Sequence, residues 1–134
     1  MSFLLDTDIC SAYLKARREI SGRFVQYSGG LFISTVTMAE LWTWAGRAGA
    51  PTSRSDQTKE FLETVHIVPV DEEIALACGM IRAGLFDRGI TVPLPDLMIA
   101  ATALTRDLTL VTHNVRDYSS IPNLRIQDWL AAGN

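Results

Sequence analysis

Apolar and polar residues alternate along the chain in short blocks that predict strands and helices in turn. Short apolar runs with the character of buried strands occur at 3–5 (FLL), 31–34 (LFIS), 66–70 (HIVPV), 108–112 (LTLVT) and 124–126 (LRI). Helical patterns lie between them, at 7–28 with an interruption near Gly22, and at 36–48, 55–64, 71–88 and 96–106. Because no repeat or Pro-, Gly- or Ser-rich linker divides the chain, residues 1–134 are predicted to form a single domain.

Two of the helical segments indicate how the elements pack. In 71–88, apolar residues recur three or four positions apart, at Ile74, Ala77, Cys78, Ile81 and Leu85, which predicts one buried face. Segment 96–106 is apolar almost all round and should be central. Strands that alternate with helices predict an α/β fold with a mostly parallel sheet, covered on both faces. In such folds the ligand site lies beyond the carboxyl ends of the strands.

Composition narrows the class of protein. The 48% hydrophobic content indicates a compact globule, and the net charge of −3 argues against a passive nucleic-acid binder. That charge still permits an enzyme that carries its positive charge on a metal. Cys10 and Cys78 lie in apolar, helix-like segments, as buried free thiols do. Without a signal peptide or a membrane-spanning apolar run, the protein is expected to be cytoplasmic.

Four acidic residues stand where predicted strands end or predicted helices begin. Asp6 ends the first strand, and Glu40 lies in the first turn of the helix after the second. Asp96 opens the central helix, and Asp117 follows the strand at 108–112. Because parallel strands share one carboxyl edge, these acids should face a common crevice, where crowding raises pKa values or demands a cation. Carboxylates without a nearby lysine suit a hard ion such as Mg²⁺ or Mn²⁺.

Each acid also has a purely structural interpretation. Asp6 or Asp8 would cap the first helix, and Asp96 after a proline would be a good N-cap. Glu40, with the threonine three positions earlier, spells a capping box. Asp117 would be an ordinary loop acid. Capping is favoured for each residue taken singly, and the metal interpretation is favoured for the four together.

Four stretches of the chain carry a family resemblance. They are LLDTDIC near the start, ISTVTMAEL around Glu40, PLPDLMIAATAL around Asp96 and LVTHNVRDYSSIPNLRIQDW near the end. Together they resemble the PIN-domain ribonucleases, and more narrowly the VapC toxins of bacterial VapBC toxin–antitoxin pairs. The resemblance implies a three-layer α/β/α fold around a parallel sheet of four or five strands. It also implies a Mg²⁺- or Mn²⁺-dependent endoribonuclease that hydrolyses RNA phosphodiester bonds.

The resemblance assigns roles to the clustered acids. Asp6 and Asp96 match the two most dependable metal-binding and catalytic acids of the family, and Glu40 matches the third. Each of these residues is therefore predicted to take part both in metal binding and in catalysis.

The fourth acid is where the chain departs from the family pattern. Many members read T-x-D after the last core strand, and here Thr112, His113 and Asn114 put an amide at that place. Asp117 matches the acid of a T-x-N-x-x-D/E variant and is the predicted fourth catalytic and metal-binding residue. Asn114 and Thr112 are predicted auxiliaries, and Asp8 matches a polar position beside the first acid, with a supporting or capping role.

The resemblance also implies partners. These are an RNA substrate, a cognate VapB antitoxin that blocks the acidic pocket, and a second copy in a homodimer; operator DNA would be contacted only through the toxin–antitoxin complex. An alternative is a PIN fold that acts mainly as a binding or regulatory partner, its metal site weakened by Asn114. Haloacid dehalogenase-like phosphatases and response-regulator receivers fit poorly, because lysine occurs only at positions 15 and 59.

Overall fold

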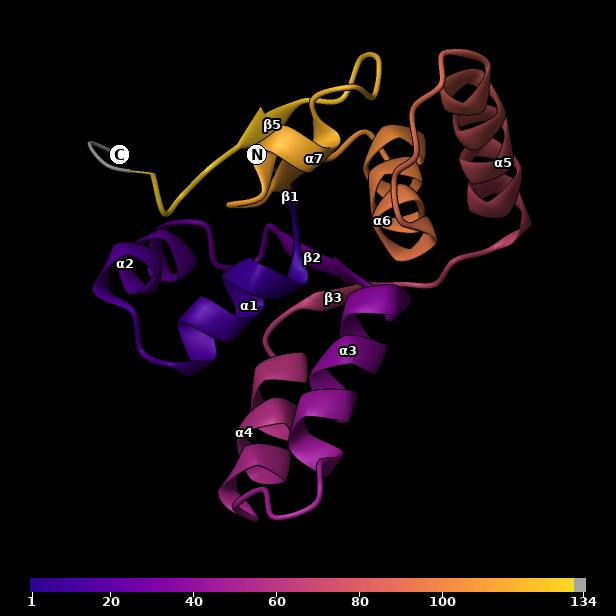
Figure 1. Cartoon of the computed structure of the whole chain (residues 1–134). Coiled ribbons are helices and arrows are strands. Elements are labelled where there is room, and N and C mark those ends of the chain that lie inside the picture. Colours follow the sequence, from indigo (N-terminus) through magenta and orange to yellow (C-terminus); the bar gives the residue numbers. More distant parts are fainter. Residues whose placement is uncertain (132–134) are drawn as a thin grey trace.

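The computed structural model describes residues 1–131 of the chain (Figure 1). Its strands are β1 (Phe3–Leu5), β2 (Leu31–Ser34), β3 (His66–Val68), β4 (Thr109–Val111) and β5 (Ile126–Gln127). Its helices are α1 (Thr7–Leu14), α2 (Arg18–Gln26), α3 (Thr35–Gly46), α4 (Ser53–Leu62), α5 (Glu72–Asp87), α6 (Leu94–Thr105) and α7 (Val115–Tyr118). The predicted domain also includes residues 132–134, which lie outside the described part.

All five strands form one parallel sheet in the order β3-β2-β1-β4-β5. β1 lies at its centre, where Leu4 pairs with Phe32 of β2 and with Leu110 of β4. All three residues of β1 are fully buried, as a central parallel strand requires. The predicted α/β fold with a parallel sheet is confirmed, and the carboxyl ends of β1, β2 and β4 meet at one edge.

Side chains that alternate along the strands fill two separate cores. Leu4 belongs to a core with residues of α5 and α6, which pack side by side, whereas Phe3 and Leu5 belong to a core with residues of α1, α2 and α4. In Figure 1, α5 and α6 lie to one side of the strands and α1 and α2 to the other. The sheet is therefore sandwiched between helices, and the predicted three layers are present.

The central helix and Trp129 both contribute to the cores. α6 buries Leu97, Ile99 and a run of small alanines, so the prediction of a central helix is confirmed. Near the carboxyl end, the Trp129 ring is buried edge-on against Phe3, with 5.2 Å between ring centroids. Among the described residues no helix is long and apolar enough to cross a membrane.

The interruption predicted near Gly22 is wrong in position. Gly22 lies inside α2, and the chain breaks instead between α1 and α2 at Ala16, whose φ is 57°. A left-handed residue cannot continue a right-handed helix, so α1 ends before Ala16. The short helix α7 is an element that the hydrophobic pattern did not predict.

Candidate functional site

Asp6 stands at the carboxyl end of β1, where it is 7% exposed and both of its oxygens accept hydrogen bonds. Oδ1 accepts from the backbone amide of Thr7 at 2.8 Å, so Asp6 is the N-cap of α1 and the capping interpretation is confirmed. Oδ2 accepts from the hydroxyl of Thr112 at 2.8 Å. The carboxylate is thus held in one orientation at the junction of β1, α1 and β4.

Thr7 links Glu40 to Asp6, although Thr7 was not among the predicted site residues. The Thr7 hydroxyl donates to Oε1 of Glu40 at 2.7 Å, and Thr7 directly follows Asp6. Glu40 itself is exposed and is the sixth residue of α3, so its placement in the first turn is wrong. The predicted capping box with Thr37 is wrong too, because Ser34 caps α3 by accepting from the amide of Val36 at 3.0 Å.

Asp96 is the third residue of α6, and the N-cap of that helix is Pro93. The prediction of Asp96 as an N-cap is therefore wrong. Its Oδ1 instead accepts a long hydrogen bond of 3.4 Å from the Tyr118 hydroxyl. Partial burial raises the pKa of Asp96, and the neighbouring charges of Asp6, Glu40 and Asp117 raise it further. The charges of all three other predicted acids therefore act on Asp96.

Asp117 lies on α7, so it is a helical residue and not a loop acid. Its Oδ2 accepts a hydrogen bond of 2.8 Å from the side-chain amide of Asn114. Asp117 contributes less to the raised pKa of Asp96 than Asp6 or Glu40 does. Of the three other acids, Asp117 therefore acts least on Asp96, and Asn114 is bound to it.

Asp8 supports the loop that follows β4. Its Oδ2 accepts from the backbone amide of His113 at 3.0 Å, which fits the predicted supporting role. Oδ1 is buried and has no hydrogen-bond partner among the described residues. Burial, reinforced by the charge of Asp6, raises the pKa of Asp8 to about 6. The His113 ring lies beside Asp128, with Nδ1 3.0 Å from Oδ2.

The donor set fits a hard divalent cation in its chemistry. All the predicted ligands offer oxygen, and an added positive charge would offset both the repulsion at Asp96 and the unpartnered oxygen of Asp8. In residues 1–131, however, no group of three or more His, Cys, Asp or Glu side chains is arranged to hold a metal as it stands. The acids share one electrostatic neighbourhood, and metal binding by them stays a prediction.

Tyr118 and Thr7 are site residues that the sequence analysis missed. The signal for Thr7 was its place between two aspartates, and the signal for Tyr118 was its place one residue after Asp117. Neither spacing indicates which carboxylate a hydroxyl meets, because that depends on how α3 and α6 pack on the sheet.

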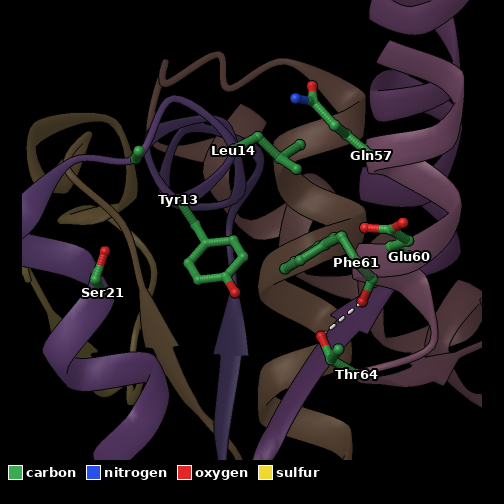
Figure 2. A pocket seen from close by; sticks show the side chains of 8 residues that line it. Tyr13, Leu14, Ser21, Gln57, Glu60, Phe61 and Thr64 are labelled. Atoms are coloured by element: carbon green, nitrogen blue, oxygen red, sulfur yellow. Dashed lines mark hydrogen bonds between the residues drawn. The ribbon is translucent and has the colours of Figure 1, made fainter. Parts of the chain in front are cut away.

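A pocket of about 380 Å³ lies apart from these acids, between α1, α2 and α4. Figure 2 shows the Tyr13 ring beside Phe61 at its wall, with the Thr64 hydroxyl donating to the Phe61 carbonyl at 2.7 Å. Glu60 is the only acid in the described lining. None of the predicted site residues lines this pocket.

Comparisons with known proteins decide the family. A family model described as PIN domain matches residues 3–123. The "tRNA(fMet)-specific endonuclease VapC" of Salmonella typhimurium is 35% identical over 96% of this chain and 98% of its own length. "Ribonuclease VapC2" of Haemophilus influenzae is 31% identical over 97% and 99%. The chain belongs to the PIN-domain family, among its VapC ribonucleases.

Solved structures agree with that membership. The VapC fold of this chain is similar to that in DNA-bound VapBC from Salmonella typhimurium, with a TM-score of 0.92 at 34% identity over 96% of this chain and 98% of the other. It is also similar to VapBC-1 from nontypeable Haemophilus influenzae, with a TM-score of 0.85 at 28% identity over 98% and 100%. The predicted PIN fold and a VapC-type ribonuclease toxin, a hydrolase, are thereby confirmed.

Proposed function

We propose that this VapC acts as a Mg²⁺- or Mn²⁺-dependent endoribonuclease and as the toxin of a VapBC-type module. One observation carries the metal assignment: burial and the charges of Asp6, Glu40 and Asp117 together raise the pKa of Asp96. Asp6, Glu40, Asp96 and Asp117 come from four separate parts of the chain. No cationic side chain is among the groups that shift the pKa of Asp96. A divalent cation is the ligand that makes such crowding favourable.

In the proposed site, Asp6, Glu40, Asp96 and Asp117 hold the cation. When bound, the cation would polarise a phosphate oxygen and lower the pKa of a coordinated water. The protein's own groups set the geometry: Thr112 and the Thr7 amide fix the Asp6 carboxylate. Glu40 is exposed and is held through one oxygen by Thr7, so its carboxylate can take a proton from the attacking water.

The partners are proposed from relatives. The Salmonella typhimurium relative is named a tRNA(fMet)-specific endonuclease, so tRNA is the first RNA class to test here. The structural neighbours from Salmonella typhimurium and Rickettsia felis are VapBC complexes bound to DNA. By analogy, this chain would pair with a VapB-type antitoxin in the cytoplasm and reach operator DNA only through that complex. A homodimer is proposed on the family resemblance alone.

One observation favours the alternative of a binding or regulatory protein. Asn114 stands where many family members have an acid, and its amide donates to Asp117 at 2.8 Å. That bond occupies one oxygen of the proposed fourth ligand. A site weakened in this way would bind RNA or the antitoxin without cleaving.

The test is an RNA-cleavage assay with purified, antitoxin-free protein in Mg²⁺, Mn²⁺ or EDTA. Total tRNA and structured mRNA fragments serve as substrates. We expect cleavage only with metal, and its loss in Asp6→Asn and Asp96→Asn. Asp107→Asn is the control, since Asp107 is exposed and lies before the opposite end of β4. Cleavage that persists in EDTA or survives both substitutions rules out the metal mechanism, and RNA binding without cleavage favours the alternative.

A further inference from the structure

Tyr118 combines a core ring with a polar end among the acids. The residue is fully buried, and its ring packs in the core formed by β1, β4, α5 and α6. A buried tyrosine hydroxyl normally finds a hydrogen-bond partner, and here the partner is Oδ1 of Asp96 at 3.4 Å. Filling the core would require only the ring, so the hydroxyl calls for a separate explanation.

The surroundings of this hydroxyl keep it a donor. The carboxylates of Asp96 and Asp6 near this hydroxyl can only accept hydrogen bonds when they are ionised. The Tyr118 hydroxyl is therefore the donor in its bond to Asp96. Asp6 is also near enough for its charge to act on the hydroxyl, so the hydroxyl lies close to the two acids that the proposed site depends on most.

The segment from Thr112 to Tyr118 supplies a hydroxyl to each of these acids. Thr112, at the carboxyl end of β4, donates to Asp6 at 2.8 Å, and Tyr118, at the end of α7, donates to Asp96 at 3.4 Å. A hydrogen bond within the segment stabilises it, because the Thr112 hydroxyl oxygen accepts from the backbone amide of Asn114 at 3.0 Å. The two acids, 90 positions apart in the chain, are thus oriented from one short stretch.

We propose that Tyr118 is a positioning residue of the metal site, whose hydroxyl holds the Asp96 carboxylate toward Asp6. This inference rests on the proposed function, since it assumes that Asp6 and Asp96 bind the cation. Carboxylates that ligate metals generally accept hydrogen bonds from an outer layer of groups. Such a bond fixes the rotamer before the metal arrives and offsets part of the repulsion between the acids.

The test is a calorimetric Mn²⁺ titration, without RNA, of wild type and Tyr118→Phe. Phenylalanine keeps the ring and removes only the hydroxyl. We expect about 10-fold weaker Mn²⁺ binding, within the range seen when outer-layer partners of ligands are lost. The control is Tyr27→Phe, because Tyr27 packs on Phe3 and Trp129 outside the acid group. The control should bind Mn²⁺ as wild type does.

A second readout separates positioning from folding. If Tyr118 positions Asp96, the activity lost in Tyr118→Phe should return toward wild type as Mn²⁺ is raised to saturation. A deficit that is unchanged by saturating Mn²⁺, or Mn²⁺ affinity within twofold of wild type, overturns the inference while leaving the proposed function intact. If wild type itself does not bind Mn²⁺, or Asp96→Asn binds it equally well, the proposed function fails and this inference fails with it.

Discussion

The hydroxyl of Thr112 donates a hydrogen bond of 2.8 Å to Oδ2 of Asp6, although the two residues lie 106 positions apart. Both side chains are buried, and the backbone amide of Asp6 donates to the Val111 carbonyl at 2.9 Å at the same junction. The orientation of Asp6 is therefore set by the pairing of β1 with β4. This pairing is the physical link between the fold and the candidate site.

Replacing Thr112 with valine should destabilise the metal-free protein. The substitution keeps the volume but removes the donor to the buried Asp6 carboxylate and the acceptor of the Asn114 backbone amide. The loss should cost about 1–3 kcal/mol of the free energy of unfolding. Urea unfolding monitored by circular dichroism measures this loss. Thr109→Val is the matched control on the same strand, because Thr109 accepts only a 3.3 Å bond from Arg125 at the opposite end. Equal effects at both positions would show that the bond to Asp6 contributes nothing special.

Neutralising Asp96 should stabilise the metal-free protein. Its pKa is raised by burial and by Asp6, so the ionised form is disfavoured in the fold, and Asp96→Asn removes that cost. The gain should stay below about 1 kcal/mol, because the residue is partly exposed. Thermal melts in EDTA measure it.

The same substitution at Asp71 should have the opposite sign. Asp71 is the N-cap of α5 and pairs with Arg106, and hydrogen bonding to the Ile74 amide lowers its pKa. Asp71→Asn should therefore melt below wild type. If Asp96→Asn also melts clearly below wild type, Asp96 has a structural role that outweighs the repulsion.

The stability of the metal-free protein should increase as the pH falls from 7 toward 4. The pKa of Asp8 is raised from 3.8 to about 6, so the folded state binds more protons than the unfolded state between these values. Protonation therefore favours folding across this window, and the raised pKa of Asp96 acts in the same direction. Melting temperatures measured in EDTA test this, and we expect a higher value at about pH 5 than at about pH 7.5.

Asp8→Asn should flatten that dependence. The variant keeps an acceptor for the His113 amide but cannot titrate, so its melting temperature should change less with pH than that of wild type. Asp87→Asn, at an exposed position at the end of α5, should behave as wild type does. Parallel curves for Asp8→Asn and wild type would remove Asp8 as the source of the effect.

Asp117 should contribute less to metal binding than Asp96. It adds least among the three acids to the raised pKa of Asp96, and one of its oxygens is bound by Asn114. We expect Asp96→Asn to weaken Mn²⁺ binding by more than about 100-fold and Asp117→Asn by less than about 10-fold, the bounds of an outer-layer effect. Calorimetric titration compares them, and a larger loss for Asp117→Asn would make it a main ligand.

Hydrophobic periodicity and composition predicted the strands, the parallel sheet and the edge of the sheet that the acids share, because each depends on which residues are buried. The errors in placing the acids on their helices occur at helix starts, where one residue can serve two elements. Ser34 both ends β2 and caps α3, and so Glu40 falls in the second turn. Pro95 fits the second position of α6, where its missing amide costs nothing, so the helix begins before Asp96.

The fine structure of the site was beyond sequence reasoning for a different reason. The bonds from Thr7 to Glu40 and from Tyr118 to Asp96 cross 33 and 22 positions, and each depends on how two helices settle against the sheet. Periodicity indicates which face of a helix is buried but not which hydroxyl meets which carboxylate. The acids could be predicted as a group, with Thr112 as an auxiliary that in the structure orients Asp6. The hydroxyls of Thr7 and Tyr118, which meet Glu40 and Asp96, could not be predicted.

The proposed function depends above all on one divalent cation bound between Asp6 and Asp96. The most direct test is the anomalous difference map of a crystal of this protein soaked in Mn²⁺. We expect a strong peak within coordination distance of carboxylate oxygens from both residues, and no such peak in a crystal of the Asp96→Asn variant. A map with no peak there, or with Mn²⁺ bound only by acids elsewhere on the protein, would contradict it.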